Sequence, residues 1–321
     1  MISRESRTRW CKKNNNGDSP GKMSDPTAAE LDGTVSWGVL LSETRQLLES
    51  SSIQGNPRQE AKWILEEVTG TSGADFVDAM DGLATVRGVA HLDALVARRR
   101  AGEPIQYVLG HWAFRNLDLL VDQRVLIPRP ETEVVAGLAI AELDRLARPE
   151  ARVIDLGTGS GAIGLAIASE RPGTQVVLTD RSNDALAVAR ANLGGLGRSG
   201  RGVSVYAGEW FDAVPADQKG SVDVIVSNPP YIAQAEMLDA SVAEWEPEMA
   251  LRAGDDGLDD LRIIVSESTE WLARGGALVL EMGSEQTAVV ADLAERAGFS
   301  TTEVHRDMAG KERAVVARLG S

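Results

Sequence analysis

The 321-residue sequence contains a single cysteine, Cys11, and only three histidines. One cysteine excludes an internal disulfide and is typical of a reducing compartment, so we expect a cytoplasmic protein. The histidines, His91, His111 and His305, are scattered without the spacing of zinc ligands and without an obvious catalytic pairing. The sequence therefore predicts no metal site.

Long apolar runs and a positive net charge are also missing. No uninterrupted apolar stretch approaches the roughly 20 residues that cross a bilayer, and residues 1–23 offer no apolar stretch for a secretory signal. The formal net charge is −15, whereas proteins that bind bare DNA or RNA normally present a basic face to the phosphates. We therefore expect neither a membrane nor nucleic acid as a direct partner, and a protein or small-molecule substrate is favoured.

The first 33 residues differ in composition from the rest of the chain. They hold three of the six lysines, at positions 12, 13 and 22, and show no hydrophobic periodicity. Such a segment cannot bury a core, and we predict that residues 1–33 are a disordered tail. Two alternatives remain open: the true start is Met23, or the three arginines among the first nine residues belong to a mitochondrial targeting segment.

Apolar residues recur at helical spacing over residues 34–102, which predicts a small N-terminal helical bundle. The three arginines at 98–100 stand at the end of its last amphipathic stretch, and we expect them to form a solvated helix terminus. Residues 103–130 carry short apolar runs with turns at Gly110 and Asn116. This second pattern predicts a β-hairpin linker.

Residues 131–321 alternate between short apolar runs and helical segments, which predicts an α/β domain with a doubly wound, mostly parallel sheet. The last two strands have no helix between them, so they should form a terminal hairpin with one antiparallel strand. The expected strands are 153–154, 176–179, 203–206, 222–226, 277–280, 301–304 and 314–319, and the expected helices are 131–146, 162–169, 184–193, 258–272 and 286–297.

The first chemical motif is the segment DLGTGSG at residues 155–161, between an expected strand and an expected helix. Glycines in such a turn let the backbone approach a ligand that a Cβ atom would exclude. Ligands of open α/β sheets bind at the carboxyl ends of the strands. Gly157, Gly159 and Ala162 also match the dinucleotide fingerprint, with Asp180 at the offset of a ribose-binding acid. From this motif alone, a dinucleotide site, another ligand site and a purely structural turn all remain open.

The second motif is the tetrapeptide Asn228, Pro229, Pro230 and Tyr231, which follows the strand expected at 222–226. The two prolines end the strand's hydrogen bonding and fix the backbone. The Asn228 side-chain oxygen and the Pro229 carbonyl could accept both N–H protons of a planar amide or amino group. The lone pair on the nitrogen of this substrate group would then be aimed at a methyl donor, while Tyr231 stacks on the flat face of the same group. The motif favours nitrogen methylation over hydride transfer, with a structural turn as the alternative.

Taken together, the two motifs resemble those of the class I S-adenosylmethionine-dependent methyltransferases. Further segments narrow the resemblance to the HemK/PrmC family of peptide chain release factor glutamine N5-methyltransferases: GEPIQY at 102–107, Gly110 followed by Phe114, LIPRPETE at 126–133, and Glu-Pro at 246–247. The resemblance runs from about residue 35 to the C-terminus. It implies a Rossmann-like, seven-stranded methyltransferase domain over 131–321, joined through the hairpin to the small helical domain.

The resemblance implies S-adenosylmethionine as the cofactor. The glycine turn would hold its methionine part, Asp180 its ribose hydroxyls and Trp210 its adenine, unless Trp210 is an ordinary core aromatic. Phe114 and Arg129 would line the cofactor pocket, with core packing and a surface ion pair as equally open alternatives. The implied cofactor-binding residues are Gly157, Thr158, Gly159, Ser160, Gly161, Asp180, Trp210 and Asn228.

The implied reaction transfers a methyl group to the side-chain nitrogen N5 of a glutamine in the GGQ motif of peptide chain release factors. Asn228, Pro229 and Tyr231 would be catalytic, and these three with Pro230 would hold the glutamine. The helical domain and the hairpin would form part of the docking surface. Alternatives are a ribosomal-protein glutamine, adenine or cytosine in nucleic acid, hydride transfer by a nicotinamide-dependent oxidoreductase, and a binding module without activity.

Overall fold

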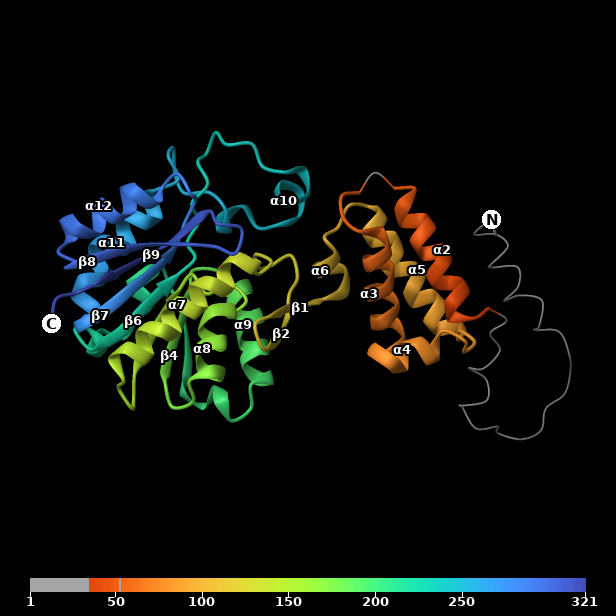
Figure 1. Cartoon of the computed structure of the whole chain (residues 1–321), viewed down its shortest axis with the longest axis horizontal. Helices are drawn as coiled ribbons and strands as arrows, with labels where there is room; N and C mark the ends of the chain where they lie inside the picture. Colours follow the sequence, from red (N-terminus) through yellow and green to blue (C-terminus); the bar gives the residue numbers. More distant parts are fainter. Residues whose placement is uncertain (1–34, 52) are drawn as a thin grey trace, which may run out of the picture. The chain divides into compact units, whose positions relative to one another are not determined.

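The computed structural model describes residues 35–51 and 53–321. The expectations for residues 1–33, the disordered tail and its two alternatives, lie outside the described residues. By its internal contacts the chain divides after Leu109 into a helical unit and a second unit, Gly110–Ser321 (Figure 1). The predicted hairpin linker, residues 103–130, thus contributes to both units.

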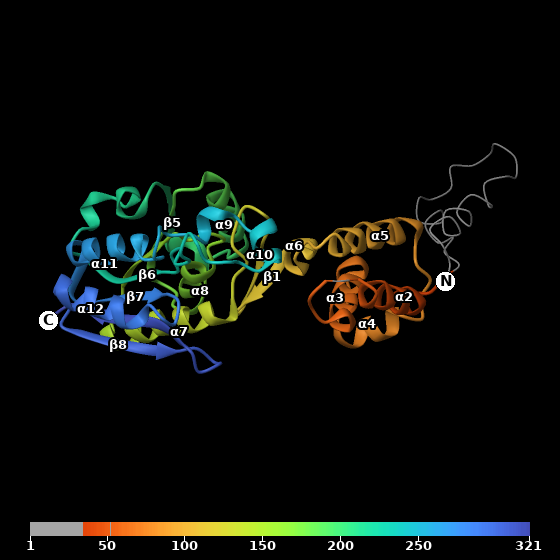
Figure 2. The same ribbon diagram turned by 90° about the horizontal axis from the view of Figure 1, so that it is seen from above.

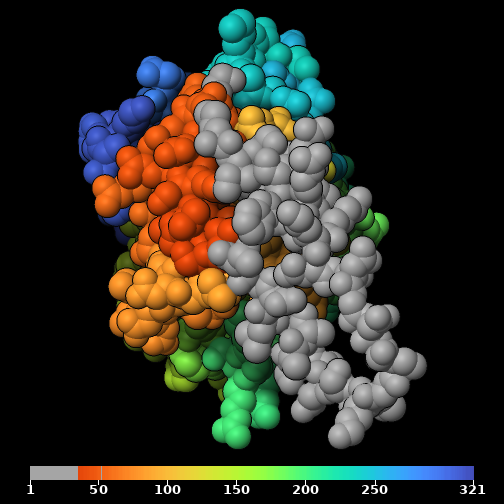
Figure 3. All heavy atoms as spheres, turned by 90° about the vertical axis from the view of Figure 1, so that its right-hand side faces the viewer, coloured from red at the N-terminus to blue at the C-terminus, as the bar shows by residue number. Residues whose placement is uncertain are grey.

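Five helices share one apolar core in the described part of the first unit. The side chains of Ser36, Asn56 and Thr85 each accept a backbone N–H bond at a helix start, which explains where three of the helices begin. In the space-filling view the red and orange atoms of this unit lie packed against one another on the face turned to the viewer (Figure 3). Two of them are too short to display a helical period in the sequence and were not expected. The helices are α2 (Trp37–Glu49), α3 (Pro57–Thr69), α4 (Gly73–Ala79), α5 (Val86–Arg100) and α6 (Ile105–Leu109).

The expectation of a solvated arginine run at the end of α5 is wrong for Arg99, which is only 6% exposed. Its guanidinium donates from Nε to Glu60 Oε2 over 2.8 Å and from Nη2 to the Gln54 carbonyl over 2.6 Å. Glu60, on α3, is also buried. Arg99 therefore joins α5 to α3 by an ion pair inside the helical unit.

Replacement of Arg99 by alanine is expected to destabilise the helical unit by about 3–5 kcal/mol, because the Glu60 carboxylate would stay buried without its cation. Denaturant unfolding of the full chain, followed by the helical circular dichroism signal, measures this loss. The matched control is Arg100→Ala, since Arg100 is exposed on the same helix turn and should change stability by less than about 0.5 kcal/mol. Equal stability of the two variants would contradict the buried ion pair.

The second unit is built on a seven-stranded sheet in the order β5-β4-β3-β6-β7-β9-β8. In this sheet β9 runs in the opposite direction to the other strands, so its pairs with β7 and β8 are antiparallel, and the remaining four pairs are parallel. The predicted doubly wound, mostly parallel sheet with a terminal hairpin is confirmed. The strands are β3 (Arg152–Leu156), β4 (Gln175–Asp180), β5 (Val203–Ala207), β6 (Val222–Ser227), β7 (Leu272–Glu281), β8 (Thr301–Arg306) and β9 (Glu312–Arg318).

Helices cover both faces of this sheet (Figures 1 and 2). Successive strand residues point to opposite faces, so Val153 and Val224 enter one apolar core while Ile154 and Ile225 enter the other. The chain builds β3, β4 and β5 outward in one direction and then returns to place β6 on the other side of β3. The strand order therefore reverses between β3 and β6, where open α/β sheets form a ligand crevice. The helices are α7 (Pro130–Leu146), α8 (Ala162–Glu170) and α9 (Asn183–Gly195) on one face and α11 (Asp259–Trp271) and α12 (Thr287–Ala297) on the other.

The predicted hairpin is present as β1 (His111–Phe114) and β2 (Leu117–Leu120), with Phe114 paired to Leu117 across the turn. Phe114 is 1% exposed and belongs to the same apolar core as α7 and α8. The hairpin is therefore packed into the second unit. None of the helices in the described ranges is both long and apolar enough to cross a bilayer.

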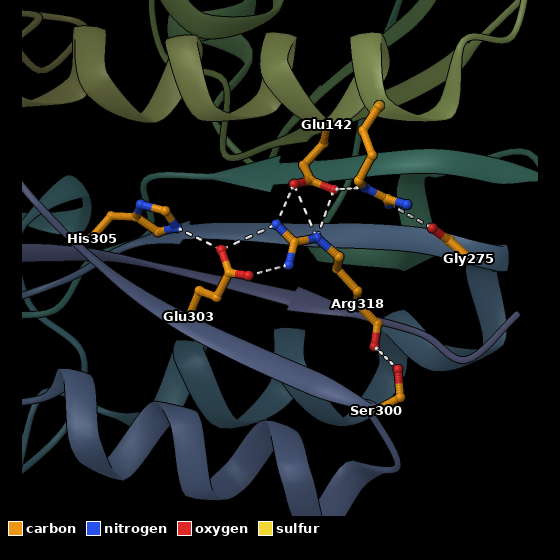
Figure 4. A network of polar contacts seen from close by, with 7 residues as sticks. Glu142, Gly275, Ser300, Glu303, His305 and Arg318 are labelled. Atoms are coloured by element: carbon orange, nitrogen blue, oxygen red, sulfur yellow. Dashed lines mark hydrogen bonds and ion pairs between the residues drawn. The ribbon is translucent and has the colours of Figure 1, made fainter.

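A buried glutamate on α7, Glu142, holds the C-terminal strand pair against this helix layer (Figure 4). Arg318 of β9 donates from Nη2 to Glu142 Oε1 over 2.7 Å and from Nη1 to Glu303 Oε1 of β8 over 2.6 Å. Arg145 donates to Glu142 Oε2 over 2.7 Å. Burial alone would raise the pKa of Glu142, but the two arginines lower it. This glutamate consequently stays ionised and ties α7 to the sheet.

Candidate active site

The glycine turn lies between β3 and α8, at the carboxyl end of the central strand. Gly157, Gly159 and Gly161 have φ values of 66°, 56° and 87°, in the left-handed region that residues with a Cβ atom rarely adopt. A Cβ on Gly157 would lie 3.3 Å from the Trp210 ring. The Thr158 N–H donates to the Thr179 carbonyl of β4 over 2.8 Å. The turn is thus held open across the ends of β3 and β4.

Asp155, the first residue of this motif, carries a buried carboxylate that is hydrogen-bonded to the turn and to the start of α8. Its Oδ2 accepts from the Thr158 hydroxyl over 2.6 Å and from the Gly164 N–H over 2.9 Å. Its Oδ1 is buried without a hydrogen-bond partner among the described residues. Burial raises the pKa of Asp155 to about 7. One carboxylate oxygen therefore remains available to a cationic group in the cavity.

Asp180 ends β4 directly opposite the turn. Its Oδ2 accepts from the Gly159 N–H over 2.9 Å and its Oδ1 from the Ser182 N–H over 2.8 Å. Burial raises its pKa, and these two hydrogen bonds oppose that shift. Asp180 consequently supports the glycine turn as well as facing the cavity.

Trp210 begins the short helix η2 (Trp210–Ala213) after β5 with a φ of 41° and is 9% exposed. Its ring lines the cavity beside Gly157 and also belongs to the apolar core that contains Leu156. Trp210 is therefore both part of the cavity wall and part of the apolar core, so the two expectations for this residue do not exclude each other.

The Asn-Pro-Pro-Tyr tetrapeptide follows β6, next to the glycine turn. The Ser227 hydroxyl at the end of β6 donates to the Leu156 carbonyl of β3 over 2.7 Å. The Asn228 amide donates from Nδ2 to the Thr132 hydroxyl of α7 over 3.3 Å. Gln286 donates from Nε2 to the Tyr231 carbonyl over 2.9 Å. Side chains from neighbouring elements thus hold both ends of the tetrapeptide.

A single cavity of the second unit brings most of the predicted site residues together. Three others, Gly161, Pro229 and Tyr231, are not among the residues that line it. Tyr231 is half-buried against the second core, and burial, with the charge of Glu281, raises the pKa of its hydroxyl to about 12. The predicted residues in the lining are Gly157, Thr158, Gly159, Ser160, Asp180, Trp210, Asn228 and Pro230.

Phe114 and Arg129, for which a place in the cofactor pocket was one of two open alternatives, do not line this cavity. Phe114 is packed in the core, as noted above, and Arg129 forms an ion pair with the buried Glu246. Glu246 also accepts from the Ile127 N–H over 3.1 Å. The structure supports core packing for Phe114 and an ion pair for Arg129. The cavity wall comes from neighbouring residues, including Leu126 and Pro128.

Asn192 of α9 is a site residue that the sequence interpretation missed. Its Oδ1 accepts from the Leu120 N–H over 2.7 Å, and its Nδ2 donates to the carbonyls of Leu120 and Ser160 over 3.1 and 2.8 Å. It is 7% exposed. Asn192 therefore fixes the glycine turn to strand β2 of the hairpin. A signal was present, because Asn192 continues the buried face of Ala185, Val188 and Ala189 at helical spacing.

Two family models match the chain. One is described as the PrmC N-terminal domain and matches residues 40–110, and the other as the Methyltransferase small domain, matching residues 137–245. The second match contains the glycine turn, Asp180, Trp210 and Asn228. Within the described residues there is no group of three or more histidine, cysteine, aspartate or glutamate side chains that could hold a metal ion.

Curated relatives are similar over nearly the whole chain. A release factor glutamine methyltransferase from Rhodospirillum rubrum is 36% identical over 94% of this chain and 91% of its own length. Proteins of the same name from Geobacter sulfurreducens and Escherichia coli are 38% and 37% identical, over 88% and 85% of this chain and 98% and 96% of their own lengths. A solved methyltransferase from Pyrococcus furiosus has a TM-score of 0.47 and 18% identity, over 71% of this chain and 98% of that one. That last likeness is too distant to bear on substrate or mechanism.

Proposed function

The chain belongs to the release factor glutamine methyltransferase family, and we propose that it methylates the side-chain amide nitrogen of a glutamine in peptide chain release factors. The glutamine would be that of the GGQ motif, and the enzyme would work in the cytoplasm with its substrate. One observation carries the proposal: the glycine turn and Asn228 meet at one cavity where the strand order reverses between β3 and β6.

The residues around the cavity suit S-adenosylmethionine. This cofactor, when bound, supplies a methyl group activated by a sulfonium sulfur. Asp155, whose buried Oδ1 has no partner among the described residues, would accept from the ammonium group. The backbone of the open glycine turn would hold the methionine carboxylate, Asp180 would accept from the ribose hydroxyls, and Trp210 would cover the adenine.

The tetrapeptide would position the glutamine. Asn228 Oδ1 and the Pro229 carbonyl would accept the two N–H protons of the substrate amide, which pulls its nitrogen lone pair out of conjugation. Pro230 and Tyr231 would hold the flat face of the amide. Because the prolines and the bond from Gln286 to the Tyr231 carbonyl fix this segment beforehand, most of the acceleration should come from positioning and preorganised polar groups.

Labelled S-adenosylmethionine tests the proposal directly. The full chain is incubated with a release factor, with the same release factor whose GGQ glutamine is replaced, with ribosomal protein and with DNA. We expect label on the intact release factor and none on the glutamine-replaced protein. Label on ribosomal protein or DNA instead would favour the alternative substrates, and label on none of the four would overturn the proposal.

A further inference from the structure

Three polar side chains from different elements meet beside the tetrapeptide. Asn228 follows the end of β6, and Glu281 is the last residue of β7. The two strands pair in parallel, with Ser227 opposite Leu280. Asn228 follows Ser227 and Glu281 follows Leu280, so Asn228 and Glu281 lie side by side at the carboxyl edge of the sheet. Thr132, in the first turn of α7, lies against both.

Thr132 stands between the other two side chains. Asn228 Nδ2 donates to Thr132 Oγ1 over 3.3 Å. The Thr132 hydroxyl also lies beside the Glu281 carboxyl, whose pKa it lowers. Thr132 is 4% exposed and Glu281 is 1% exposed, and Glu281 Oε2 has no hydrogen-bond partner among the described residues. Thr132 and Asn228 line the cavity, whereas the Glu281 carboxyl is buried behind them.

The chemistry of Glu281 and Thr132 determines which end of the Asn228 carboxamide faces Thr132. An ionised carboxylate only accepts hydrogen bonds, so the carboxylate of Glu281 favours the orientation in which the single hydroxyl proton of Thr132 points toward it. The Thr132 oxygen is then left as an acceptor toward Asn228, and an acceptor selects the NH2 end of the asparagine amide. With Nδ2 turned to Thr132, the other end of the carboxamide, Oδ1, is free for the substrate.

We propose that Thr132 and Glu281 are positioning residues that fix the orientation of the Asn228 carboxamide, so that its oxygen faces the substrate amide. This inference rests on the proposed function, because only an N–H donor on the substrate requires an acceptor at Asn228. The opposite orientation would place the Asn228 NH2 against the substrate NH2, two donors facing each other, and the amide nitrogen would lose one of the acceptors that align it.

The protonation state of Glu281 controls the orientation of the Asn228 carboxamide, and the charges around Glu281 set the pH at which it changes. Burial raises the pKa of Glu281 to about 7, and the Thr132 hydroxyl, Arg313 of β9 and Arg129 oppose the rise while Glu131 adds to it. The charge of Glu281 also raises the pKa of the Tyr231 hydroxyl, and Arg313 forms a second ion pair with Asp307 at 3.5 Å. Once protonated, Glu281 can donate to Thr132, and the hydroxyl proton is released to bond a flipped Asn228. Asn228 is therefore held with Oδ1 toward the substrate only while Glu281 is ionised. Methyl transfer should slow as the pH falls through the pKa of Glu281.

The hydroxyl of Thr132 is tested by comparing Thr132→Val with Thr132→Ser in single-turnover methylation of a release factor at saturating S-adenosylmethionine. We expect Thr132→Val to slow methyl transfer by about tenfold to a hundredfold, because an oriented polar contact of the site is lost. Thr132→Ser, which keeps the hydroxyl, should recover most of that loss. Cofactor affinity, measured by calorimetry, should change far less than the rate.

A matched control is Thr287→Val, because the buried Thr287 hydroxyl donates to a glutamate, Glu312 Oε2, over 2.9 Å and Thr287 does not line the cavity. This loss of a buried threonine hydroxyl elsewhere in the second unit should leave the rate close to wild type. A wild-type rate for Thr132→Val, or an equal loss in Thr132→Ser, would overturn the proposal.

The pH profile separates positioning from simple packing. In Glu281→Gln the group no longer ionises, so the fall in rate around a pKa of about 7 should disappear under saturating cofactor. Burial places the pKa of Asp155 in the same range, but the ammonium group of the bound cofactor would keep Asp155 ionised, and Asp155 is unchanged in the variant. Persistence of the wild-type pH dependence in Glu281→Gln would contradict the role of Glu281. Failure of the wild-type enzyme to label any release factor would instead refute the proposed function.

Discussion

Replacement of Asn228 by alanine is expected to slow methyl transfer by roughly 10²–10³-fold, the effect of losing one oriented polar group from a preorganised site. The variant loses the Oδ1 acceptor, which acts mainly in the transition state, when the amide nitrogen must give up its conjugation. The backbone of the tetrapeptide stays in place, because the Ser227 hydroxyl and Gln286 hold its two ends. Single-turnover methylation of a release factor at saturating cofactor measures the rate.

Three further substitutions define the mechanism around Asn228. Asn228→Asp keeps an acceptor but cannot donate to Thr132, so we expect cofactor binding to be retained and the substrate to be misoriented. Tyr231→Phe should cost less than Tyr231→Ala if stacking, and not the hydroxyl, is what the ring contributes. Full activity of Asn228→Ala, or label on a release factor that lacks its target glutamine, would show that the acceptor mechanism is wrong.

Replacement of Asp180 by alanine is expected to weaken S-adenosylmethionine binding by about 1.5–3 kcal/mol, the contribution of a hydrogen bond that involves a charged group. The carboxylate would accept from the ribose, and it also accepts from the Gly159 and Ser182 N–H groups. Its loss should therefore loosen the glycine turn that holds the methionine part. Titration calorimetry of the full chain with S-adenosylmethionine measures the affinity.

The matched control is Asp180→Asn, which removes the charge but keeps one acceptor, and its loss should be intermediate. Circular dichroism confirms that both variants are folded. Unchanged affinity in a folded Asp180→Ala protein would refute the assigned role. Tighter binding of NAD than of S-adenosylmethionine by the wild-type chain would favour the oxidoreductase alternative.

Most helices and strands of the second unit could be predicted because their patterns are local. Alternating strands and helices, glycines in a strand-to-helix turn and prolines after a strand depend on residues close in the chain. Short elements were missed for the same reason: α4 and α6 span seven and five residues, which is less than two helical turns.

Arg99 and Asn192 show where a local pattern was present but not used. Each continues the buried face of its helix, Arg99 after Leu92, Leu95 and Val96, and Asn192 after the apolar residues of α9. A polar residue in such a position must find hydrogen-bond partners inside the protein. Helical spacing shows that these side chains are buried, but the partners lie on elements distant in sequence.

The sequence by itself determined the α/β class, the mostly parallel sheet with its antiparallel strand, the two motifs at strand ends and the family resemblance. Only the tertiary structure decided which residues surround the cavity, which oxygen of Asp155 has no partner among the described residues, and that Thr132 stands between Asn228 and Glu281. The reason is physical. Secondary structure follows from steric and hydrophobic periodicity along the chain, whereas orientation, hydrogen bonding and pKa depend on burial and on neighbours that only the strand order brings together.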